Sequence, residues 1–448
     1  MVKKLMPRGR NIGSAGLVVL MTATGNLSAA DLHGVVEQKL PALLTFYREL
    51  HARPELSFHE KETSAKLAGA LRELGFEVAA PVGKYPDPGL TSYGVVAVLK
   101  NGNGPTVLVR TDLDALPVEE KTGAPYASTV RMTDLNGEEA PVMHACGHDM
   151  HVTTLLGTAQ VLVSLKDRWK GTLVLIGQPD EERGGGARAL LADGLYQRWP
   201  VPDYCLAQHG DPTIDAGKIG YCPGWAMANI DMIDITIRGV GSHGAQPHKG
   251  RDPIVVSAEV INNLQTLVSR TIDPVETGVV TVGSIHGGSK HNIIPDKVEL
   301  QLTVRSFTDQ VRQQLLTGIE RICMNTARAL DVPEDRLPIV HNRTEEFFPA
   351  LYNDPPLVET SVKAFQAALG AYNVLLRNKT TGGEDFSELG RTKEKVPIFM
   401  FFVGTGDPSV APKDRPGWQS ALYLPVAEPA LRTGMLAMSS AVLNLLKK

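Results

Sequence analysis

The stretch GVVAVLKNGNGPTVLV, residues 94–109, holds two short apolar runs separated by Gly, Asn and Pro. Residues 94–99 and 106–109 consist almost entirely of Val, Leu, Ala and Gly. Continuous apolar runs of this length, bounded by turn residues, are typical of strands covered on both faces. The stretch therefore predicts two buried strands of a sheet.

Segments on both sides of this stretch alternate between helical and strand patterns. Helical periodicity runs over 32–50 and 60–74 before it and returns at 150–165 and 187–195, with apolar strands expected at 172–176 and 204–207. This alternation predicts an α/β sheet with helices on its faces. A further buried strand is expected at 396–403, near the end of the chain.

The pattern changes near Gly224. Residues 230–238, IDMIDITIR, alternate apolar and polar residues, and strands at 278–285 and 297–305 follow, with helices at 253–269 and 309–330. One-faced alternation predicts an antiparallel sheet covered by helices, a small α+β layer. A chain of 448 residues is longer than one hydrophobic core usually supports, so two domains are expected. We expect the α+β layer, 224–342, to be inserted into a domain formed by 31–223 and 343–448.

Composition excludes several classes of partner. The net charge is −4, from 45 basic and 49 acidic residues, and no dense basic block is present to bind nucleic acid or a membrane surface. No stretch reaches the roughly 18 apolar residues of a membrane span. We expect a small molecule, uncharged or acidic, as the partner.

Residues 1–30 resemble a secretory signal peptide. Four basic residues between positions 3 and 10 precede the apolar run 15–23 and the small residues Ser28, Ala29 and Ala30. We therefore expect export, in a bacterium to the periplasm; a frayed amphipathic N-terminus is the alternative. Of the four cysteines, Cys205 and Cys222 are able to pair in an oxidising compartment, although their spacing does not show that they do.

The nine residues MHACGHDMH, 143–151, place a cysteine and three histidines just before a predicted helix. Cys146 and His148 offer a thiolate and an imidazole, which suit zinc or a similar transition metal. Two alternatives to a metal site remain open. In the first, Cys146 is a nucleophile that His144 or His148 activates; in the second, the residues form a structural cluster without chemistry.

Other metal-binding residue types follow neighbouring strands, where active sites of α/β sheets form. Each has an ordinary explanation: an Asx turn or helix cap for a pair of aspartates, a helix N-terminus for a pair of glutamates, a loop position for a lone histidine. Their convergence on consecutive strand ends favours a two-metal hydrolytic centre, in which one glutamate removes a proton from the attacking water. The residues are Asp112, Asp114, Cys146, His148, Glu181 as the base, Glu182 and His209.

Polar residues of the inserted segment form a second set. His243 lies in the Gly-rich turn 239–244, from which it can reach an oxyanion, whereas His248 precedes a helix and can cap it. Asn292 and Arg305 can bind a carboxylate, the anion that a guanidinium matches best. Each of them alone is more often a surface residue.

Seven motifs in order resemble the auxin-conjugate amidohydrolase and hippurate hydrolase branch of the aminoacylase/carboxypeptidase G metallopeptidases. They extend over residues 51–387, most of the chain after the leader. The motifs are HARPELSFHE (51–60), RTDLDALPVEE (110–120), HACGHDMH (144–151), GQPDEERGGGARALL (177–191), GSHGAQPH (241–248), NIIPD (292–296) and GGEDFS (382–387).

The resemblance implies a catalytic α/β domain with a mixed sheet and an inserted α+β lid that also dimerises in relatives. It implies hydrolysis of an amide between an acyl group and an amino acid, or of a C-terminal peptide bond, with one or two divalent ions (Zn, Mn, Co or Ni) per chain and a homodimer. Site roles carry over by position: Cys146 as bridging ligand; His148, Glu182 and His209 as terminal ligands; Glu181 as base; Asp114 as orienting residue; Asp112 where other branches carry a metal histidine; His243 at the oxyanion; Asn292 and Arg305 at the substrate carboxylate.

One departure from the family pattern concerns the last metal ligand, a histidine near the C-terminus in relatives. The last histidine here is His341, and Gln419 occupies the corresponding position in PGWQSALYLP, 416–425. Since an amide oxygen is a poorer ligand than imidazole for borderline metals, we expect weaker binding of the metal that shares Cys146 and Glu182. An alternative function is a binding or regulatory protein on the same fold, with catalysis impaired at this site.

Overall fold

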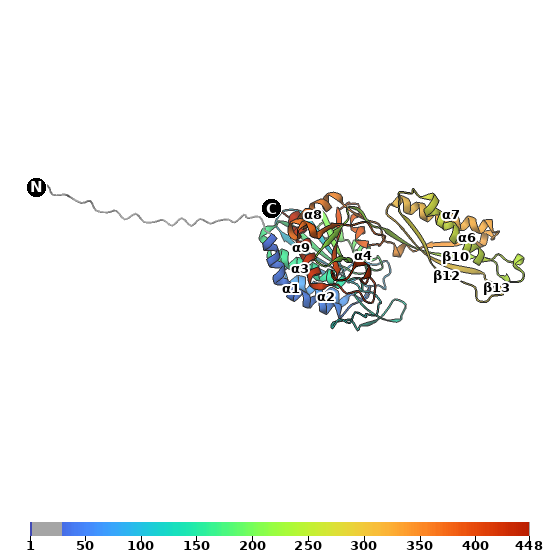
Figure 1. Cartoon of the computed structure of the whole chain (residues 1–448), viewed down its shortest axis with the longest axis horizontal. Coiled ribbons are helices and arrows are strands. Elements are labelled where there is room, and N and C mark those ends of the chain that lie inside the picture. Colours follow the sequence, from blue (N-terminus) through green and yellow to red (C-terminus); the bar gives the residue numbers. More distant parts are fainter. Residues whose placement is uncertain (2–28, 448) are drawn as a thin grey trace.

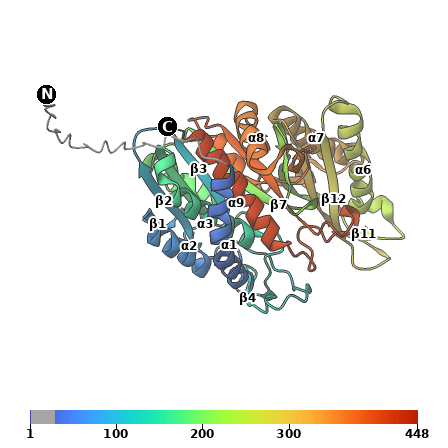
Figure 2. The same cartoon turned by 60° about the vertical axis from the view of Figure 1, so that its left-hand side comes forward.

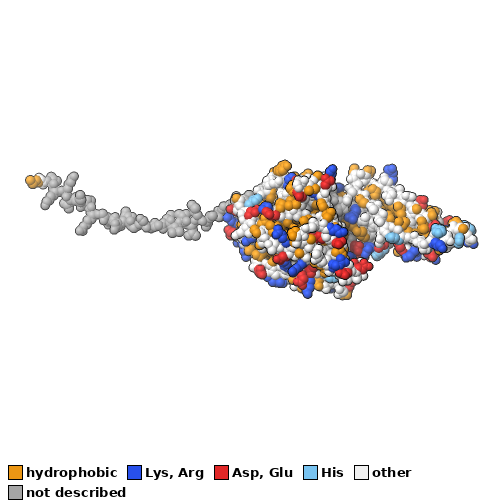
Figure 3. Space-filling model, turned by 60° about the horizontal axis from the view of Figure 1, so that its bottom comes forward, with side chains coloured by type: hydrophobic (Ala, Val, Ile, Leu, Met, Phe, Trp, Pro, Cys, Tyr) orange, Lys and Arg blue, Asp and Glu red, His pale blue; other side chains and the backbone are white. Residues whose placement is uncertain are grey.

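The computed structural model describes residue 1 and residues 29–447 and shows two lobes joined by a narrow waist (Figure 1). The predicted signal peptide therefore lies almost wholly outside the described residues. Basic and acidic side chains are interspersed on the face drawn in Figure 3. Within the described part of the chain, no helix has the length and hydropathy to cross a membrane.

The larger lobe is built on an eight-stranded mixed sheet, in the order β1-β2-β6-β3-β7-β18-β8-β17. Its strands are β1 (Glu77–Val82), β2 (Gly94–Asn101), β6 (Gly171–Gln178), β3 (Thr106–Asp112), β7 (Tyr204–Asp215), β18 (Ile398–Gly406), β8 (Ile219–Tyr221) and β17 (Val374–Leu376). The apolar runs at 94–99 and 106–109 are buried strands, as predicted. They are not neighbours, because β6 lies between them.

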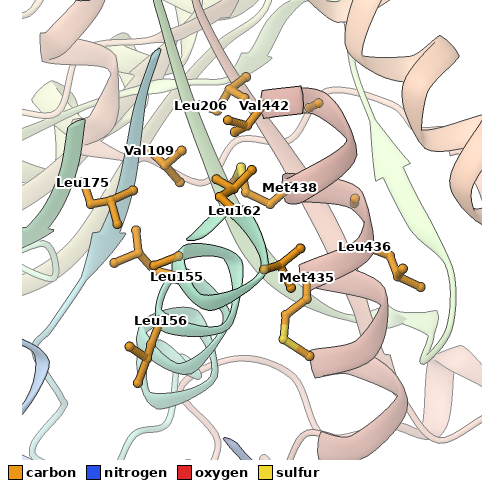
Figure 4. Close-up of a cluster of buried hydrophobic side chains, with 14 of the residues drawn as sticks. Val109, Leu155, Leu156, Leu162, Leu175, Leu206, Met435, Leu436, Met438 and Val442 are labelled. Atoms are coloured by element: carbon orange, nitrogen blue, oxygen red, sulfur yellow. The ribbon is translucent and has the colours of Figure 1, made fainter. Parts of the chain in front are cut away.

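Helices cover both faces of this sheet (Figure 2). One face carries α1 (Ala29–His51), α2 (Lys61–Glu73), α3 (His148–Ser164), α8 (Pro355–Leu369) and α9 (Ala427–Leu445); the other carries α4 (Gly186–Ala192) and α5 (Leu195–Arg198). Figure 4 shows Leu155 of α3 and Met438 of α9 packed with Val109 and Leu206 of the sheet. This core fixes the N-terminus of α3 beside the strand ends.

The smaller lobe is an antiparallel four-stranded sheet with two helices on one face, which confirms the predicted α+β layer. In order, its strands are β12 (Gly278–Gly287), β14 (Lys297–Ser306), β10 (Asn229–Arg238) and β15 (Ile339–Asn342); its helices are α6 (Pro253–Thr266) and α7 (Asp309–Ala329). Alternate side chains of β10, such as Ile233 and Ile235, enter the core. The boundaries at 224 and 342 stay predictions.

Short ladders complete the fold. β9 (Gly224–Met227) pairs with β16 (Leu351–Asn353) between the lobes, and β4 (Arg131–Thr133) pairs with β5 (Glu139–Pro141) in a hairpin of the larger lobe. β11 (Ser242–His243) pairs with β13 (Ile293–Ile294). Figure 1 places β13 at the end of the smaller lobe remote from the larger lobe.

Several local expectations were wrong in detail. The strand expected at 204–207 continues to Asp215, because β18 pairs along its length, so His209 lies inside a strand and not in a loop. The helix expected at 187–195 breaks into α4 and α5 at Gly194, whose φ of 88° is left-handed. The sequence left open whether Cys205 and Cys222 pair, and in the structure all four cysteines are free thiols.

Candidate metal centre

A cluster of metal-binding residue types lies at the carboxyl ends of β3 and β6 and at the middle of β7, next to the N-terminus of α3. Ligand-capable atoms of Cys146, His148 and His209 lie within 4.8 Å of one another, and those of His148, Glu181 and Glu182 do the same. The left-handed φ of Gly147, 85°, turns the chain between Cys146 and the first residue of α3. Residues predicted from separate strand ends therefore meet at one place.

The two histidines of the cluster are oriented as metal ligands. His148 Nδ1 lies 2.8 Å from the carbonyl oxygen of Asp114, and His209 Nδ1 lies 2.8 Å from that of Gly210. Since these carbonyls accept the Nδ1 protons, each Nε2 is left for the cluster; that of His209 carries a lone pair, and that of His148 offers one when a metal ion displaces its proton. His209 Nε2 lies 3.4 Å from Cys146 Sγ, and burial lowers the pKa of His209 to about 3, so its ring is neutral.

Unpartnered atoms in the cluster indicate that a cation fits there. His148 Nε2 and Glu182 Oε1 are buried and have no hydrogen-bond partner, which is costly for polar atoms. Although burial acts to lower it, Asp112 and neighbouring carboxylates raise the pKa of His148 to about 10. The cluster therefore attracts positive charge, and the donors present fit a divalent metal ion.

Asp112 and His151 are engaged elsewhere. Asp112 Oδ2 lies 2.8 Å from the Arg110 guanidinium, and Asp112 Oδ1 lies 2.7 Å from His151 Nδ1. His151 Nε2 accepts a hydrogen bond of 2.8 Å from the Gly210 N–H. Ligand-capable atoms of Asp112, His148 and His151 also lie within 4.8 Å of one another, so a place for Asp112 in the ligand set stays a prediction.

Asp114 holds the loop that carries the two glutamates. Its carboxylate accepts hydrogen bonds from the backbone N–H groups of Glu181 and Glu182, each at 3.1 Å, and from Ser57 Oγ at 2.7 Å. The carboxyl group is fully buried. The orienting role that the resemblance implies for Asp114 stays a prediction, and these hydrogen bonds support it.

Glu181 lies between the cluster and a second acidic group that sequence reasoning missed. Ligand-capable oxygens of Glu181, Glu384 and Asp385 lie within 4.8 Å, and Arg110 contacts Glu384 at 2.9 Å and Asp385 at 3.1 Å. Burial and the Glu384 carboxylate raise the pKa of Glu181. The GGEDFS motif was the available signal, but nothing in its local pattern indicated contact with Glu181.

The structure brings Gln419 to the cluster. Its backbone N–H donates to the carbonyl of Ala145 at 2.8 Å, and its Nε2 donates to Glu182 Oε2 at 3.3 Å. Trp418 Nε1 donates to the carbonyl of Gly210 at 2.7 Å and holds the segment over the site. An amide therefore occupies the place beside Glu182, and it uses one carboxylate oxygen as an acceptor.

The lid residues do not gather at the cluster within one chain. His243 and Asn292 are exposed and lie on or next to the β11–β13 ladder, at the remote end of the smaller lobe (Figure 1). Arg305 lies at the other end of β14, where its guanidinium donates to the carbonyl of Thr381 at 3.1 Å. Eight residues of strand separate Lys297 from Arg305, ~26 Å, so Asn292 and Arg305 of one chain do not bind the same carboxylate.

The half-buried thiol of Cys146 gathers with imidazole and carboxylate groups at one edge of an α/β sheet, and the buried carboxylate of Glu181 lies beside them. This arrangement is typical of a metal-dependent hydrolase. The family model of Peptidase family M20/M25/M40 matches residues 108–417, and the chain belongs to this family.

Two curated relatives are similar over long stretches. An N-acetyl-L-cysteine deacetylase of Bacillus subtilis is 35% identical over 367 residues, 82% of this chain and 81% of the relative. A hippurate hydrolase of Campylobacter jejuni is 38% identical over 285 residues, 63% of this chain and 69% of the relative. Among solved structures, a Bacillus subtilis protein described as a dinuclear metal-binding peptidase from the M20 family has a TM-score of 0.72 at 29% identity, covering 92% of this chain and 99% of that one.

Proposed function

We propose that this hydrolase cleaves the amide bond of N-acyl amino acids, or of small peptides, with a divalent metal at the cluster. The observation that carries the proposal is Glu181, a buried carboxylate beside the ligand set whose backbone Asp114 fixes. The relatives named for hippurate and N-acetylcysteine chemistry support acyl-amino acids as the substrate class. The auxin-conjugate branch adds indole-acyl amino acids as candidates.

The residues of the site divide the chemistry. Cys146, His148, Glu182 and His209 would hold the metal, which when bound supplies a Lewis acid and makes water acidic enough to react near neutral pH. Glu181 removes a proton from the attacking water and passes it to the leaving amine, roles that suit a carboxylate of raised pKa. The mixed donor set suits zinc, manganese, cobalt or nickel.

A homodimer completes the proposed site. His243 and Asn292 lie at the remote end of the lid, whereas Arg305 lies at its base near the larger lobe. Two copies would allow one chain to supply the oxyanion donor and the other the metal and base. Closure of the lid over the substrate would then exclude water.

The assay is release of free amino acid from a panel of acyl-amino acids: hippurate, N-acetylcysteine and an indole-acyl amino acid. We expect hydrolysis that a chelator abolishes and added metal restores, and a loss of activity in Glu181→Gln with metal content unchanged. Activity that survives chelation but is lost on alkylation of Cys146 would support a cysteine nucleophile. Binding of these compounds without turnover, at full metal occupancy, would support the binding-protein alternative.

Two further proposals concern Gln419 and the leader. We propose that the metal next to Glu182 binds weakly, because an amide hydrogen bond occupies the carboxylate that a histidine ligand would leave free. Two tightly held ions per purified chain would contradict this. We also propose export through residues 1–30, tested by N-terminal sequencing of the mature protein from a fractionated host.

A further inference from the structure

The backbone of Gly210 connects three parts of the metal site. Its carbonyl accepts hydrogen bonds from His209 Nδ1 at 2.8 Å and from Trp418 Nε1 at 2.7 Å. Its N–H donates to His151 Nε2 at 2.8 Å. β3 pairs with β7 as far as Ala207, and beyond the end of that ladder an imidazole receives the N–H in place of a strand. The direction in which His209 presents its Nε2 therefore depends on where Gly210 is held.

Gly210 has to be held by its neighbours, because glycine has more backbone freedom than any other residue. The position excludes a larger residue: a Cβ here would lie 3.1 Å from side-chain atoms of Met150, Thr405 and Tyr423. β18 runs beside Gly210, with Val403 opposite it in the parallel ladder. The hydrogen bond to an imidazole of α3 therefore adds a fixed point on a helix to the support that the sheet provides.

The imidazole of His151 is itself fixed in one orientation. The side chain is buried, and its Nδ1 donates to Asp112 Oδ1 at 2.7 Å. Asp112 Oδ2 in turn accepts from the guanidinium of Arg110 at 2.8 Å. Because Nε2 accepts from the Gly210 N–H, the ring proton lies on Nδ1, and both nitrogens are engaged in hydrogen bonds. His151 is therefore arranged to hold the backbone and not to offer a lone pair to a metal ion.

We propose that His151 is a positioning residue of the metal site. Through the backbone of Gly210 it fixes the direction in which His209 presents its Nε2, although its own ring nitrogens are bonded elsewhere. Groups that orient a metal-binding histidine typically change metal affinity about 10- to 100-fold when they are removed. The inference rests on the metal site of the proposed function, but not on the hydrolysis of any particular substrate.

Two variants of His151 differ in the group that Gly210 needs. His151→Gln keeps an oxygen near the position of Nε2 that can accept from the Gly210 N–H, whereas His151→Leu has a similar volume and no acceptor. Zn²⁺ affinity of the full chain is measured by competition with a chromophoric chelator. We expect His151→Leu to bind Zn²⁺ about 10- to 100-fold more weakly and His151→Gln to stay within about threefold of wild type.

His33 supplies the matched control. Its Nε2 lies 2.8 Å from the carbonyl oxygen of Ala368, a bond that joins α1 to α8. His33→Leu therefore removes a histidine bonded to backbone without touching Gly210, and its Zn²⁺ affinity should equal that of wild type. A loss in His33→Leu as large as that in His151→Leu would mean that general destabilisation lowers the affinity, and would overturn the proposal.

The absorption spectrum of the Co²⁺-loaded protein is the second readout, because its d–d bands report ligand geometry. We expect these bands to shift in His151→Leu and to match wild type in His151→Gln. A His151→Gln chain that loses as much affinity as His151→Leu would overturn the proposal. So would a folded His151→Leu chain with wild-type affinity and spectrum.

His151→Asn serves if His151→Leu fails to fold. Its amide nitrogen stands near the position of Nδ1 and can donate to Asp112, but it leaves the Gly210 N–H without an acceptor. Zn²⁺ affinity should fall as in His151→Leu, and wild-type affinity would overturn the proposal.

Wild-type protein separates this proposal from the proposed function. Zn²⁺ binding that His148→Ala abolishes, without hydrolysis of the acyl-amino acid panel, would contradict the proposed function alone. A wild-type chain that binds no Zn²⁺ at the cluster would overturn both.

Discussion

Replacement of Asp114 tests whether its carboxylate positions the catalytic loop. Asp114 accepts hydrogen bonds from the N–H groups of Glu181 and Glu182, each at 3.1 Å. Hydrogen bonds to a charged group contribute about 1.5–3 kcal/mol each. Asp114→Ala removes two of them, so the conformation of the Glu181–Glu182 loop loses about 3–6 kcal/mol of stabilisation. If this free energy is lost from the transition state, kcat/KM falls by about 10²–10⁴.

Asp114→Asn is the conservative variant. Its amide oxygen can accept from one of the two N–H groups, while its NH₂ group faces the other. The expected loss is about 1.5–3 kcal/mol, or about 10–10² in kcat/KM. The two variants should therefore form a series with wild type, because each step removes one acceptor from the loop.

The assay is kcat/KM for the best substrate of the acyl-amino acid panel, with metal content and melting temperature measured on the same samples. Asp134→Ala is the matched control: Asp134 also accepts from two backbone N–H groups, of Asn136 and Glu138, but in the exposed β4–β5 turn. We expect the control to change kcat/KM less than twofold. An Asp114→Ala protein that folds, keeps its metal and stays within threefold of wild type would refute the positioning role.

Three further predictions concern metal affinity and stability. Gln419→His should tighten metal binding on the order of tenfold, measured by competition with a chromophoric chelator; unchanged affinity would mean that another group already serves as ligand. For His51, burial acts to lower the pKa, but Asp149 at 2.7 Å and Glu120 at 3.1 Å raise it to about 10. The pKa of His51 is therefore higher in the folded state than in the unfolded state, where it is about 6.5. The ion pairs of His51 stabilise the fold fully below pH 6.5, and this contribution is lost as the pH rises toward 10. Wild type should therefore lose about 2.5 kcal/mol more unfolding free energy than His51→Gln between pH 7 and 9, measured by urea denaturation; parallel losses would contradict the ion pairs. Metal at 100 times its Kd should raise the unfolding free energy of the stripped protein by about 2.7 kcal/mol, seen as a calorimetric shift that His148→Ala abolishes; an equal shift in the variant would place the metal elsewhere.

The sequence by itself determined the layers of the fold and most of the cluster. A strand buried on both faces requires a continuous apolar run, and a strand with one exposed face requires alternating apolar and polar residues. The local patterns of 94–109 and 230–238 therefore indicate which faces of these strands are buried. Cys146, His148, Glu181 and Glu182 were identified for a related reason. They directly follow or flank predicted elements, and the strand ends of an α/β sheet converge.

Only the tertiary structure decided which distant residues meet. Gln419 donates to Glu182 across 237 positions, and Glu384 lies beside Glu181, through packing of β18, α9 and the loops around them. Such contacts leave no periodic trace in either segment, because they depend on sheet order and not on local pattern. The ~26 Å between the two ends of the lid strand likewise follows from register, and it is this distance that keeps Asn292 and Arg305 of one chain from binding the same carboxylate.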